Sequence, residues 1–309
     1  MALHPVIAEV VAGIPPTPED GTATVDPHQW RADEESRVPP LADRLPVTDV
    51  ADASIDTEDG SLPLRIYRQN SGTAAGLLLY FHGGAFFSGS LETHDVVARS
   101  LAVETGFTVV SVGYRRAPEA AFPAGLDDCF AALKWATSHG EELDWDSQHL
   151  AVVGDSSGGT FATVVAARAL DEGIDAITHQ VLLYPSVDLD FDLDRYPSLR
   201  ENARGYGLET AGLKPHNSFY LESGADPADP QVSPIKRDDL SGLPKTLIIT
   251  AQFDPLRDEG EAYGQRLQEA GVDVTVHRYE TANHGFLANF GQLPEFYPAF
   301  AEIGEFLQS

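Results

Sequence analysis

Apolar positions along this chain fall into two alternating patterns. Short apolar runs, typical of buried strands, lie at 77–81, 151–153 and 246–251, and residues 272–279 alternate between apolar and polar positions as a strand does. Longer helix-compatible runs alternate with them, at Glu92–Thr105, Leu126–Ser138, Phe161–Leu170 and Glu259–Gly271. This alternation predicts parallel strands joined by crossover helices. We therefore expect an α/β fold with a mostly parallel central sheet flanked by helices.

Two stretches break this rhythm. Residues 13–45 are rich in proline and charge and show no clear periodicity, which predicts a poorly regular N-terminal arm. Residues 187–229 interrupt the alternation with Asp, Pro and Gly. The chain is long enough for one large α/β domain with a small appendage. We expect an N-terminal arm at residues 1–50, an α/β domain formed by residues 51–186 and 230–309, and an insertion at residues 187–229.

A serine stands where one strand-like run meets a helix-like run. The run 151–153 is followed by Gly-Asp-Ser-Ser-Gly-Gly at 154–159, which makes Ser156 the serine of a Gly-x-Ser-x-Gly motif. The pentapeptide alone is a weak signal, because it also arises by chance. Between a strand and a helix it is typical of a sharp turn that exposes a nucleophilic serine, with glycines where a Cβ would clash.

A second glycine-rich segment, His82-Gly83-Gly84-Ala85, follows the apolar run 77–81. Acyl transfer needs backbone N–H groups aimed at a developing oxyanion, and small residues let the carbonyl group approach them. A tight turn after a strand is the alternative for this loop on its own. Together with the serine turn, the loop predicts oxyanion-hole amides.

An acid and a base follow the serine along the chain. Asp254 comes soon after the strand-like run 246–251, and His284 lies in a loop after the last such run. The order serine, acid, histidine is the order of the α/β-hydrolase arrangement. Asp258 competes with Asp254 for the acid role, but an anion there is better explained by the first turn of the helix that follows.

Further segments carry a family resemblance. The chain resembles the hormone-sensitive-lipase group of α/β-hydrolase carboxylesterases, in its Gly-Asp-Ser-x-Gly-Gly branch, at the motifs above and at Leu91–Asp95, Tyr114–Glu119, Phe122–Ala124, Glu201–Tyr206 and Asp254–Asp258. The resemblance covers the chain from about residue 60 onward. Three residues depart from the family pattern: Ala85 replaces a third glycine, Ser157 an alanine and Arg116 an apolar residue. The first two departures leave the backbone amides in place.

The resemblance implies an α/β-hydrolase fold with a small cap, built from the N-terminal arm and the mid-chain insertion. It implies a carboxylesterase that hydrolyses short-to-medium-chain acyl esters through an acyl-serine intermediate and needs no cofactor. The catalytic residues that it implies are Ser156, Asp254 and His284. The oxyanion-hole residues that it implies are Gly83, Gly84, Ala85 and Ser157. Which two of the three loop amides point inward stays open, and His82 is assigned to bracing the loop.

The charge balance of the chain is strongly acidic. Lys and Arg total 20, Asp and Glu total 48, and the formal net charge is −28. Repulsion of this size opposes the compact state at low ionic strength, and salt relieves it. The composition resembles that of proteins from extreme halophiles, whereas an acidic mesophilic surface is the alternative. It disfavours nucleic acids and anionic membranes as partners.

Other polar residues have plainer explanations than a functional site. Cys129, the only cysteine, lies in a helix-like run and is expected to be a buried packing residue. His94 and Asp95 are expected to be solvated residues at a helix start, since no metal-binding motif is present. Solvated acidic faces are likewise expected for the aspartate groups at 127–128, 188–194 and 238–239. No metal site is therefore expected.

Localisation is predicted from three observations. No apolar run approaches the roughly 20 residues that span a membrane, and residues 1–5 lack the features of a signal peptide. A single cysteine allows no disulfide within one chain. We expect a cytoplasmic enzyme whose partner is a small-molecule ester, with neither membrane nor nucleic acid bound, and a homodimer stays open.

Three other classes of protein share parts of these signals. A ligand-binding receptor of this fold lacks the catalytic histidine, so His284 argues against it. A related serine peptidase usually carries a large propeller domain, for which 309 residues leave no room. A purely structural acidic protein has no reason to carry all four loops. Ester hydrolysis is therefore the predicted function.

Overall fold

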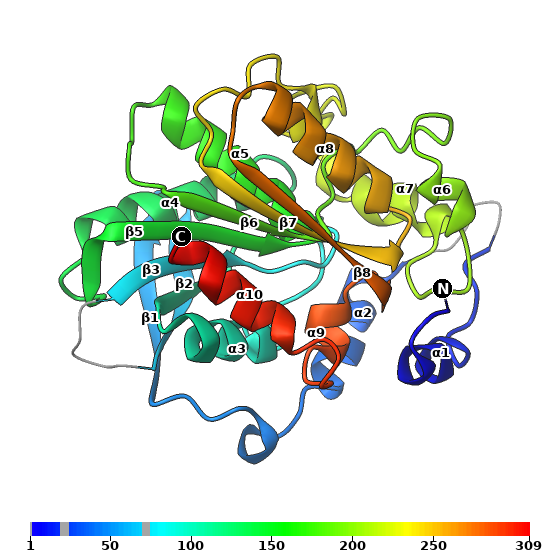
Figure 1. Cartoon of the computed structure of the whole chain (residues 1–309), viewed down its shortest axis with the longest axis horizontal. Coiled ribbons are helices and arrows are strands. Elements are labelled where there is room, and N and C mark those ends of the chain that lie inside the picture. Colours follow the sequence, from blue (N-terminus) through cyan, green and yellow to red (C-terminus); the bar gives the residue numbers. More distant parts are fainter. Residues whose placement is uncertain (1, 19–24, 70–74) are drawn as a thin grey trace.

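The computed structural model describes residues 2–18, 25–69 and 75–309. At its centre is an eight-stranded sheet with the strand order β1-β2-β4-β3-β5-β6-β7-β8 (Figure 1). The strands are β1 Asp49–Thr57, β2 Gly60–Arg68, β3 Ala75–Phe81, β4 Thr108–Val112, β5 Trp145–Asp155, β6 His179–Leu183, β7 Lys245–Phe253 and β8 Val274–Asn283. β2 pairs antiparallel with β1 and β4, and all pairs from β4 to β8 are parallel. The predicted α/β fold with a mostly parallel sheet is confirmed.

Helices of two kinds accompany the sheet. The α-helices are α1 Pro5–Val11, α2 Pro27–Ser36, α3 Asp95–Thr105, α4 Ala124–Ser138, α5 Ser157–Asp171, α6 Ser198–Glu201, α7 Thr210–Ser218, α8 Arg257–Glu269, α9 Phe286–Phe290 and α10 Pro298–Leu307. Short 3₁₀ helices are η1 Leu41–Asp43, η2 Tyr220–Ser223 and η3 Pro234–Lys236. The four predicted helices correspond to α3, α4, α5 and α8, with ends that differ by a few residues.

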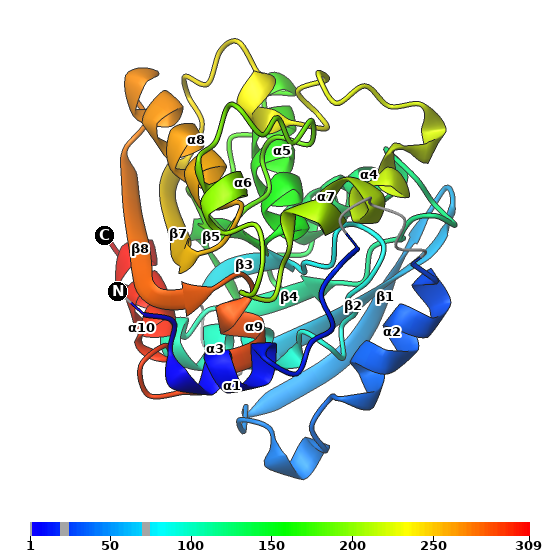
Figure 2. The same cartoon turned by 90° about the vertical axis from the view of Figure 1, so that its right-hand side faces the viewer.

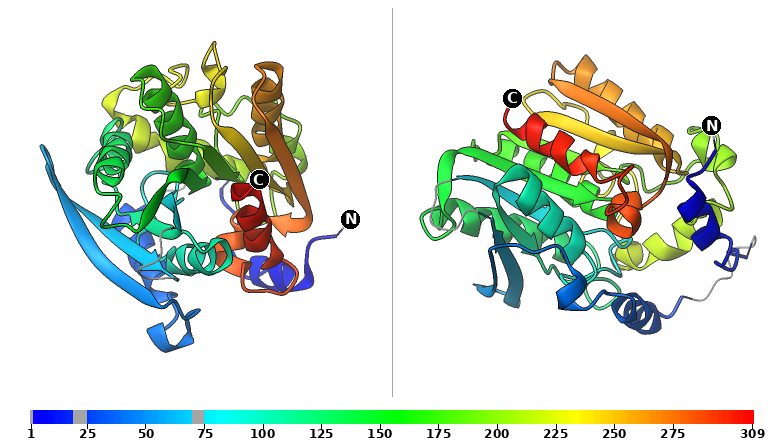
Figure 3. Two further views of the ribbon diagram at one scale, coloured as in Figure 1. Left: turned by 60° about the vertical axis from the view of Figure 1, so that its left-hand side comes forward. Right: turned by 60° about the horizontal axis from the view of Figure 1, so that its bottom comes forward.

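Helices cover both faces of the sheet. α3 and α10 lie together on one face, and α4, α5 and α8 lie on the other (Figures 1 and 3). Along β3, Leu77, Leu79 and Phe81 belong to the core on the α4–α5 side. Leu78 and Tyr80 belong to the core on the α3–α10 side. Because successive side chains of a strand point to opposite faces, a strand buried on both sides must be apolar at nearly every position.

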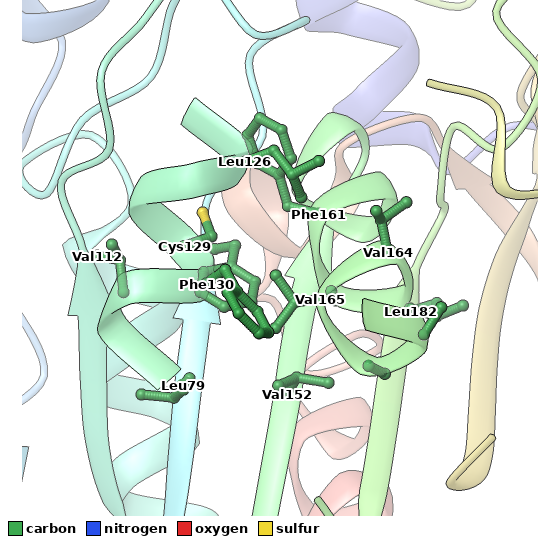
Figure 4. Close-up of a cluster of buried hydrophobic side chains, with 14 of the residues drawn as sticks. Leu79, Val112, Leu126, Cys129, Phe130, Val152, Phe161, Val164, Val165 and Leu182 are labelled. Atoms are coloured by element: carbon green, nitrogen blue, oxygen red, sulfur yellow. The ribbon is translucent and has the colours of Figure 1, made fainter. Parts of the chain in front are cut away.

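The core on the α4–α5 side is densely packed. Figure 4 shows Phe130 of α4 and Phe161 and Val165 of α5 over apolar strand residues such as Val152. Cys129 lies in the same cluster and is fully buried, as its position in an apolar helix predicts. This packing holds the strand ends and the first turn of α5 in fixed positions relative to one another.

The N-terminal arm is more regular than its sequence pattern predicts. Residues 27–36 form α2, although none of its side chains is buried. The Asp26 carboxylate accepts hydrogen bonds from the N–H groups of His28 and Gln29 at 2.9 and 3.2 Å, and Pro27 begins the helix. The prediction of a poorly regular arm is wrong here. A helix held by its cap and by polar contacts needs no apolar stripe, so periodicity does not reveal it.

α1 and α2 of the arm and α6 and α7 of the insertion lie at the carboxyl ends of the parallel strands (Figures 1 and 2). The Thr17 N–H of the arm donates to Glu209 of the insertion at 2.7 Å. The rings of Trp30 and His216, one from each segment, lie 5.2 Å apart. Sites of open parallel sheets form at this edge. The division into a domain and a cap stays a prediction.

Candidate active site

Ser156 stands on a sharp turn between β5 and α5. Its backbone φ of 54° and ψ of −120° lie in a region that few residues other than glycine adopt. A Cβ at Gly154 would lie 2.0 Å from the carbonyl oxygen of Gly158, and a Cβ at Gly158 would lie 2.0 Å from that of Phe81. Only glycine fits at these two positions, so the close approach of strand and helix holds the strained turn.

His284 and Asp254 approach this serine from two other strand ends. β7 ends at Phe253 and β8 ends at Asn283, each directly before one of these residues. His284 Nε2 lies 2.9 Å from Ser156 Oγ, and His284 Nδ1 lies 2.7 Å from Asp254 Oδ2. The structure therefore brings the three residues together in one hydrogen-bonded row.

The direction of these hydrogen bonds follows from the carboxylate. Asp254 is 0% exposed, and its second oxygen accepts the Leu256 N–H at 2.8 Å. A carboxylate only accepts hydrogen bonds, so His284 Nδ1 carries the ring proton and Nε2 is left to accept from the Ser156 hydroxyl. This tautomer allows the imidazole to remove a proton from the serine.

Asp258, the competing acid, is engaged elsewhere. It lies in the first turn of α8, and its carboxylate accepts the Ser198 N–H at 2.8 Å. Arg257 Nε donates to its other oxygen at 2.7 Å. These contacts connect α8 to α6 and do not involve His284.

Asn202 is a site residue whose role the sequence pattern does not reveal. Its Nδ2 donates to the carbonyl oxygens of Gln252 and Asp254, each at 3.0 Å. It is buried and lies in the predicted insertion, so it connects the insertion to the loop that carries Asp254. Its place within the family-like segment 201–206 is the one signal that could have singled it out.

The glycine-rich loop lies beside Ser156, but not all its amides are available. Gly83 N–H donates to Asp155 Oδ1 at 2.9 Å, so the inclusion of Gly83 among the oxyanion donors is wrong. A buried carboxylate already occupies that N–H group. The N–H groups of Gly84, Ala85 and Ser157 have no acceptor among the described residues. Ser157 also begins α5, where the helix dipole favours an anion.

His82 lies under this loop. Its Nδ1 is 2.8 Å from the carbonyl oxygen of Gly83, and its ring stacks on Tyr114 at 4.2 Å. Burial lowers the pKa of His82 to about 3, so the ring is neutral at ordinary pH. It donates its Nδ1 proton to the loop, and in the part of the chain that the structure describes it forms no hydrogen bond or ring contact with Ser156, His284 or Asp254.

His94 and Asp95 are not the solvated pair that the sequence predicts. Asp95 is 1% exposed and accepts hydrogen bonds from Arg44, Tyr67 and Arg99. His94 Nε2 lies 3.6 Å from Asp155 Oδ2, next to the glycine-rich loop. The prediction fails because most of these partners are distant in sequence.

Two aspartates differ from the expected acidic faces, whereas Asp127, Asp192, Asp194, Asp238 and Asp239 are exposed as predicted. Asp128 is buried and accepts hydrogen bonds from the backbone and side chain of Arg115. Asp188 is fully buried between Arg195 and Lys236. Paired cations therefore replace solvent at these two positions.

Within residues 2–18, 25–69 and 75–309, no group of three or more His, Cys, Asp or Glu side chains could hold a metal ion. In the same part of the chain, no helix is long and apolar enough to cross a membrane.

Comparisons with known proteins show which family this chain belongs to. A family model described as the α/β hydrolase fold matches residues 78–288. The esterase LipI of Mycobacterium tuberculosis is 40% identical over 251 residues, which cover 79% of this chain and 77% of that protein. An arylesterase of Saccharolobus solfataricus is 39% identical over 249 residues, 79% of each chain. The structure of a hyperthermophilic esterase from the archaeon Pyrobaculum calidifontis matches with a TM-score of 0.90 at 36% identity, over 100% of this chain and 98% of that one.

Proposed function

The chain belongs to the α/β hydrolase fold family and is a carboxylic ester hydrolase, and we propose that Ser156, His284 and Asp254 carry out the hydrolysis. The observation that supports this is the continuous row of hydrogen bonds from Ser156 Oγ through His284 to Asp254 Oδ2. The two distances, 2.9 and 2.7 Å, suit a nucleophile, its base and the acid that orients the base.

Acylation starts with attack of Ser156 Oγ on the acyl carbonyl carbon. The new O–C bond forms while the carbonyl π electrons move to oxygen, and His284 Nε2 takes the hydroxyl proton. Asp254 stabilises the imidazolium that results. When the tetrahedral intermediate collapses, the ester C–O bond breaks, and the leaving alcohol receives the proton from His284. The product is an acyl-serine.

Deacylation repeats these steps with water. His284 Nε2 removes a proton from a water molecule, whose oxygen attacks the acyl carbon. The second tetrahedral intermediate expels Ser156 Oγ, which takes the proton back from His284. The acid is released and the enzyme returns to its starting state. No cofactor takes part in the proposed cycle.

Both tetrahedral intermediates place a negative charge on the former carbonyl oxygen. We assign its stabilisation to the N–H groups of Gly84, Ala85 and Ser157. Each well-placed donor of this kind contributes roughly 3 kcal/mol to the stability of the transition state. The bond from Gly83 to Asp155 supports this choice, because it leaves the other amides of the loop for the oxyanion.

The proposed substrates are esters with short to medium acyl chains. Phe87, two residues after Ala85 of the glycine-rich loop, packs against Trp30 of the arm and against Phe219 of the insertion at ring distances of 5.8 and 5.2 Å. We infer that this aromatic contact limits the length of acyl chain that fits on that side of the loop. Rates on a series of aryl esters from acetate to palmitate should therefore peak at short to medium chains. A preference for emulsified long-chain triglycerides, with a rise in rate at the interface, would contradict the proposal.

Three finer assignments belong to the same proposal. We place the chain in the hormone-sensitive-lipase group, in the branch with Gly-Asp-Ser-x-Gly-Gly, because residues 154–159 have that sequence. The net charge of −28 supports adaptation to high salt. A cytoplasmic location is supported by the single, buried Cys129, which suits a reducing compartment.

The test of the proposed nucleophile is its removal. Ser156→Ala should lower kcat by several orders of magnitude and leave a small residual rate from substrate binding and the oxyanion donors. A fluorophosphonate should label the unmodified protein at Ser156, as peptide mass spectrometry would show, and should not label the variant. Full activity of Ser156→Ala, or labelling at another serine, would overturn the assignment.

A further inference from the structure

The residues on both sides of the nucleophile hold the glycine-rich loop. Asp155 Oδ1 accepts the N–H of Gly83 at 2.9 Å, and Ser157 Oγ accepts the N–H of Phe86 at 3.3 Å. We propose that Asp155 and Ser157 are positioning residues that clamp this loop at its two ends and so fix the oxyanion-hole amides between them. This inference rests on the proposed function, because it concerns the same hydrolytic site.

Asp155 is built into the molecule as an anchor. It is 2% exposed, and the oxygen that accepts the Gly83 N–H also accepts the hydroxyl of Tyr80 at 2.6 Å. Its other oxygen lies 3.6 Å from His94 Nε2. Each group that reaches the carboxylate therefore comes from the loop, from the strand before it or from the start of α3. Among the described residues, no hydrogen bond or ion pair joins Asp155 to His284 or Asp254, whereas its carboxylate accepts the Gly83 N–H of the loop.

The charge state of Asp155 suits this role. Burial alone would raise the pKa of its carboxyl, but the neighbouring His94 and the Tyr80 hydrogen bond outweigh burial and lower it. Burial would likewise lower the pKa of His94, whereas Asp155 raises it. An ionised carboxylate only accepts hydrogen bonds, so Asp155 Oδ1 can accept both the Tyr80 hydroxyl and the Gly83 amide.

The loop between the two anchors needs to be held. Gly84, Ala85 and Phe86 have φ values of 118°, 47° and 65°, a left-handed run in which only the glycine is free of strain. A Cβ at Gly83 would lie 2.6 Å from Asp155 Oδ2, so glycine is required for the backbone to reach the carboxylate. A strained segment keeps its shape only where its surroundings determine it.

The clamp links two of the departures from the family pattern. Ala85 stands where a third glycine is usual and adopts a positive φ, which is less favourable for alanine than for glycine. Ser157 stands where alanine is usual, and its hydroxyl supplies the acceptor for the Phe86 N–H next to Ala85. The extra hydrogen bond offsets part of the strain that the missing glycine introduces.

The consequence for catalysis is geometric. The proposed donors come from two segments, the loop after β3 and the first residue of α5, and the oxyanion must be within hydrogen-bond distance of both. Small displacements of such donors from their required positions lower the reaction rate strongly. The hydrogen bonds that the loop N–H groups donate to Asp155 and Ser157 fix the two segments directly to each other.

A purely structural role for Asp155 makes a different prediction. If its pairing with His94 only stabilises the fold, its loss lowers the thermal midpoint and leaves the rate constant of the folded enzyme unchanged. If it positions the loop, its loss lowers kcat and the affinity for a transition-state analogue together, while KM changes little.

The experiment compares Asp155→Ala, Asp155→Asn, Ser157→Ala and Tyr80→Phe in the full chain. For Asp155→Ala we expect kcat on an aryl ester to fall about 100-fold, with KM within about threefold of the parent value. Asp155→Asn retains an acceptor oxygen and should keep kcat within about fivefold. Ser157→Ala loses one long, neutral hydrogen bond and should lose about two- to fivefold. Tyr80→Phe removes the other hydrogen bond to Asp155 Oδ1 but spares the Gly83 bond, so its loss of kcat should be smaller than that of Asp155→Ala.

The second readout is inhibition by a boronic acid that forms a tetrahedral adduct with serine. Its inhibition constant should rise in parallel with the loss of kcat, and the product alcohol should bind as before. Asp155→Ser replaces Asp155→Ala if the alanine variant does not fold. Unchanged kcat and unchanged boronate affinity in a folded Asp155→Ala or Asp155→Ser variant would overturn the inference. Asp155→Asn as impaired as Asp155→Ala would also overturn it, because the charge would then matter rather than the acceptor.

Failure of this inference is distinguishable from failure of the proposed function. Titration with a fluorophosphonate counts the competent active sites in each variant. If Ser156 is labelled and Ser156→Ala is inactive while the Asp155 variants keep full kcat, the proposed function stands and the clamp does not. If Ser156→Ala retains activity, the proposed function itself is wrong.

Discussion

The role of a carboxylate in this protein depends on the groups that form hydrogen bonds with it. Asp254 lies in the loop before α8, and Asp258 lies four residues further on, in the first turn of that helix. From the sequence alone, both are candidates for the catalytic acid. Asp254 is buried against His284 Nδ1, whereas Asp258 accepts hydrogen bonds from Ser198 and Arg257. Only the first can hold an imidazole in the tautomer that the serine needs.

The two aspartates should therefore respond differently to the same substitution. Asp254→Asn should lower kcat on the order of 10³- to 10⁴-fold, because an amide does not hold His284 in the required tautomer. Asp258→Asn should keep kcat within a few-fold and lower the free energy of unfolding by about 1 kcal/mol, since it weakens the connection between α8 and α6. Steady-state kinetics and urea unfolding measure these effects. Equal losses of kcat in the two variants would show that the acid is misassigned.

At the scale of elements, α2 is held by polar contacts rather than by an apolar face. Arg31 donates from Nε to the carbonyl oxygen of Phe87 and from Nη2 to that of Ala117, each at 2.6 Å. It also forms a two-pronged ion pair with Glu119 at 2.8 Å. Glu34 accepts hydrogen bonds from the loop segment just after Phe87. The helix therefore docks on the loop that leads away from the proposed oxyanion donors.

Removal of Arg31 should undock this helix without unfolding the domain. Hydrogen bonds to a charged group contribute about 1.5–3 kcal/mol, so Arg31→Ala should increase the undocked population roughly tenfold or more. Cleavage of residues 27–36 by thermolysin should accelerate to a similar extent, because cleavage follows the open population.

Arg37→Ala is the matched control for this prediction. Arg37 is exposed at the end of the same helix, and its side chain is not part of the docking contacts. Its cleavage rate should equal that of the parent chain. If the two variants were cleaved equally fast, the docking of α2 would depend on something other than Arg31.

At the scale of the whole molecule, charge is the dominant feature. Even if all 20 Lys and Arg side chains paired with acids, 28 of the 48 Asp and Glu side chains would have no cation. A few carboxylates such as Asp95 and Asp188 are buried with arginine or lysine, but unpaired acids are rarely buried and must lie mainly at the surface. Their repulsion acts against the folded state as a whole.

Stability should therefore rise with salt. The Debye length falls from about 10 Å at 0.1 M to about 3 Å at 1 M, so fewer surface carboxylates repel one another. We expect the thermal midpoint and the activity to increase from low salt to molar KCl or NaCl, with slow inactivation on desalting. The chemical step uses no charge steering, so kcat per folded molecule should change little. A thermal midpoint that is flat or falls between about 0.1 and 2 M salt would refute salt adaptation and leave the ester hydrolysis intact.

Much of this architecture follows from local sequence. A strand buried on both faces must be apolar throughout, as β3 is, and a helix that packs on a sheet must be apolar on one side. The Gly154–Gly158 turn follows from steric exclusion of a Cβ, which also acts over a few residues. Periodicity and steric rules act locally, so the fold class and the proposed catalytic residues Ser156, Asp254 and His284 could be predicted from the sequence.

Tertiary structure decided the partners of the buried polar groups. The Gly83 amide is bound to Asp155, 72 positions further along the chain, and Asp95 is reached by Arg44 from the arm. α2 forms because Asp26 caps it and Arg31 finds acceptors more than fifty residues away. No local pattern specifies such contacts, because the sequence does not show whether a polar side chain forms hydrogen bonds with water or with a distant residue. Burial decides this, since a polar group inside the fold has no water and must form its hydrogen bonds with other groups of the protein.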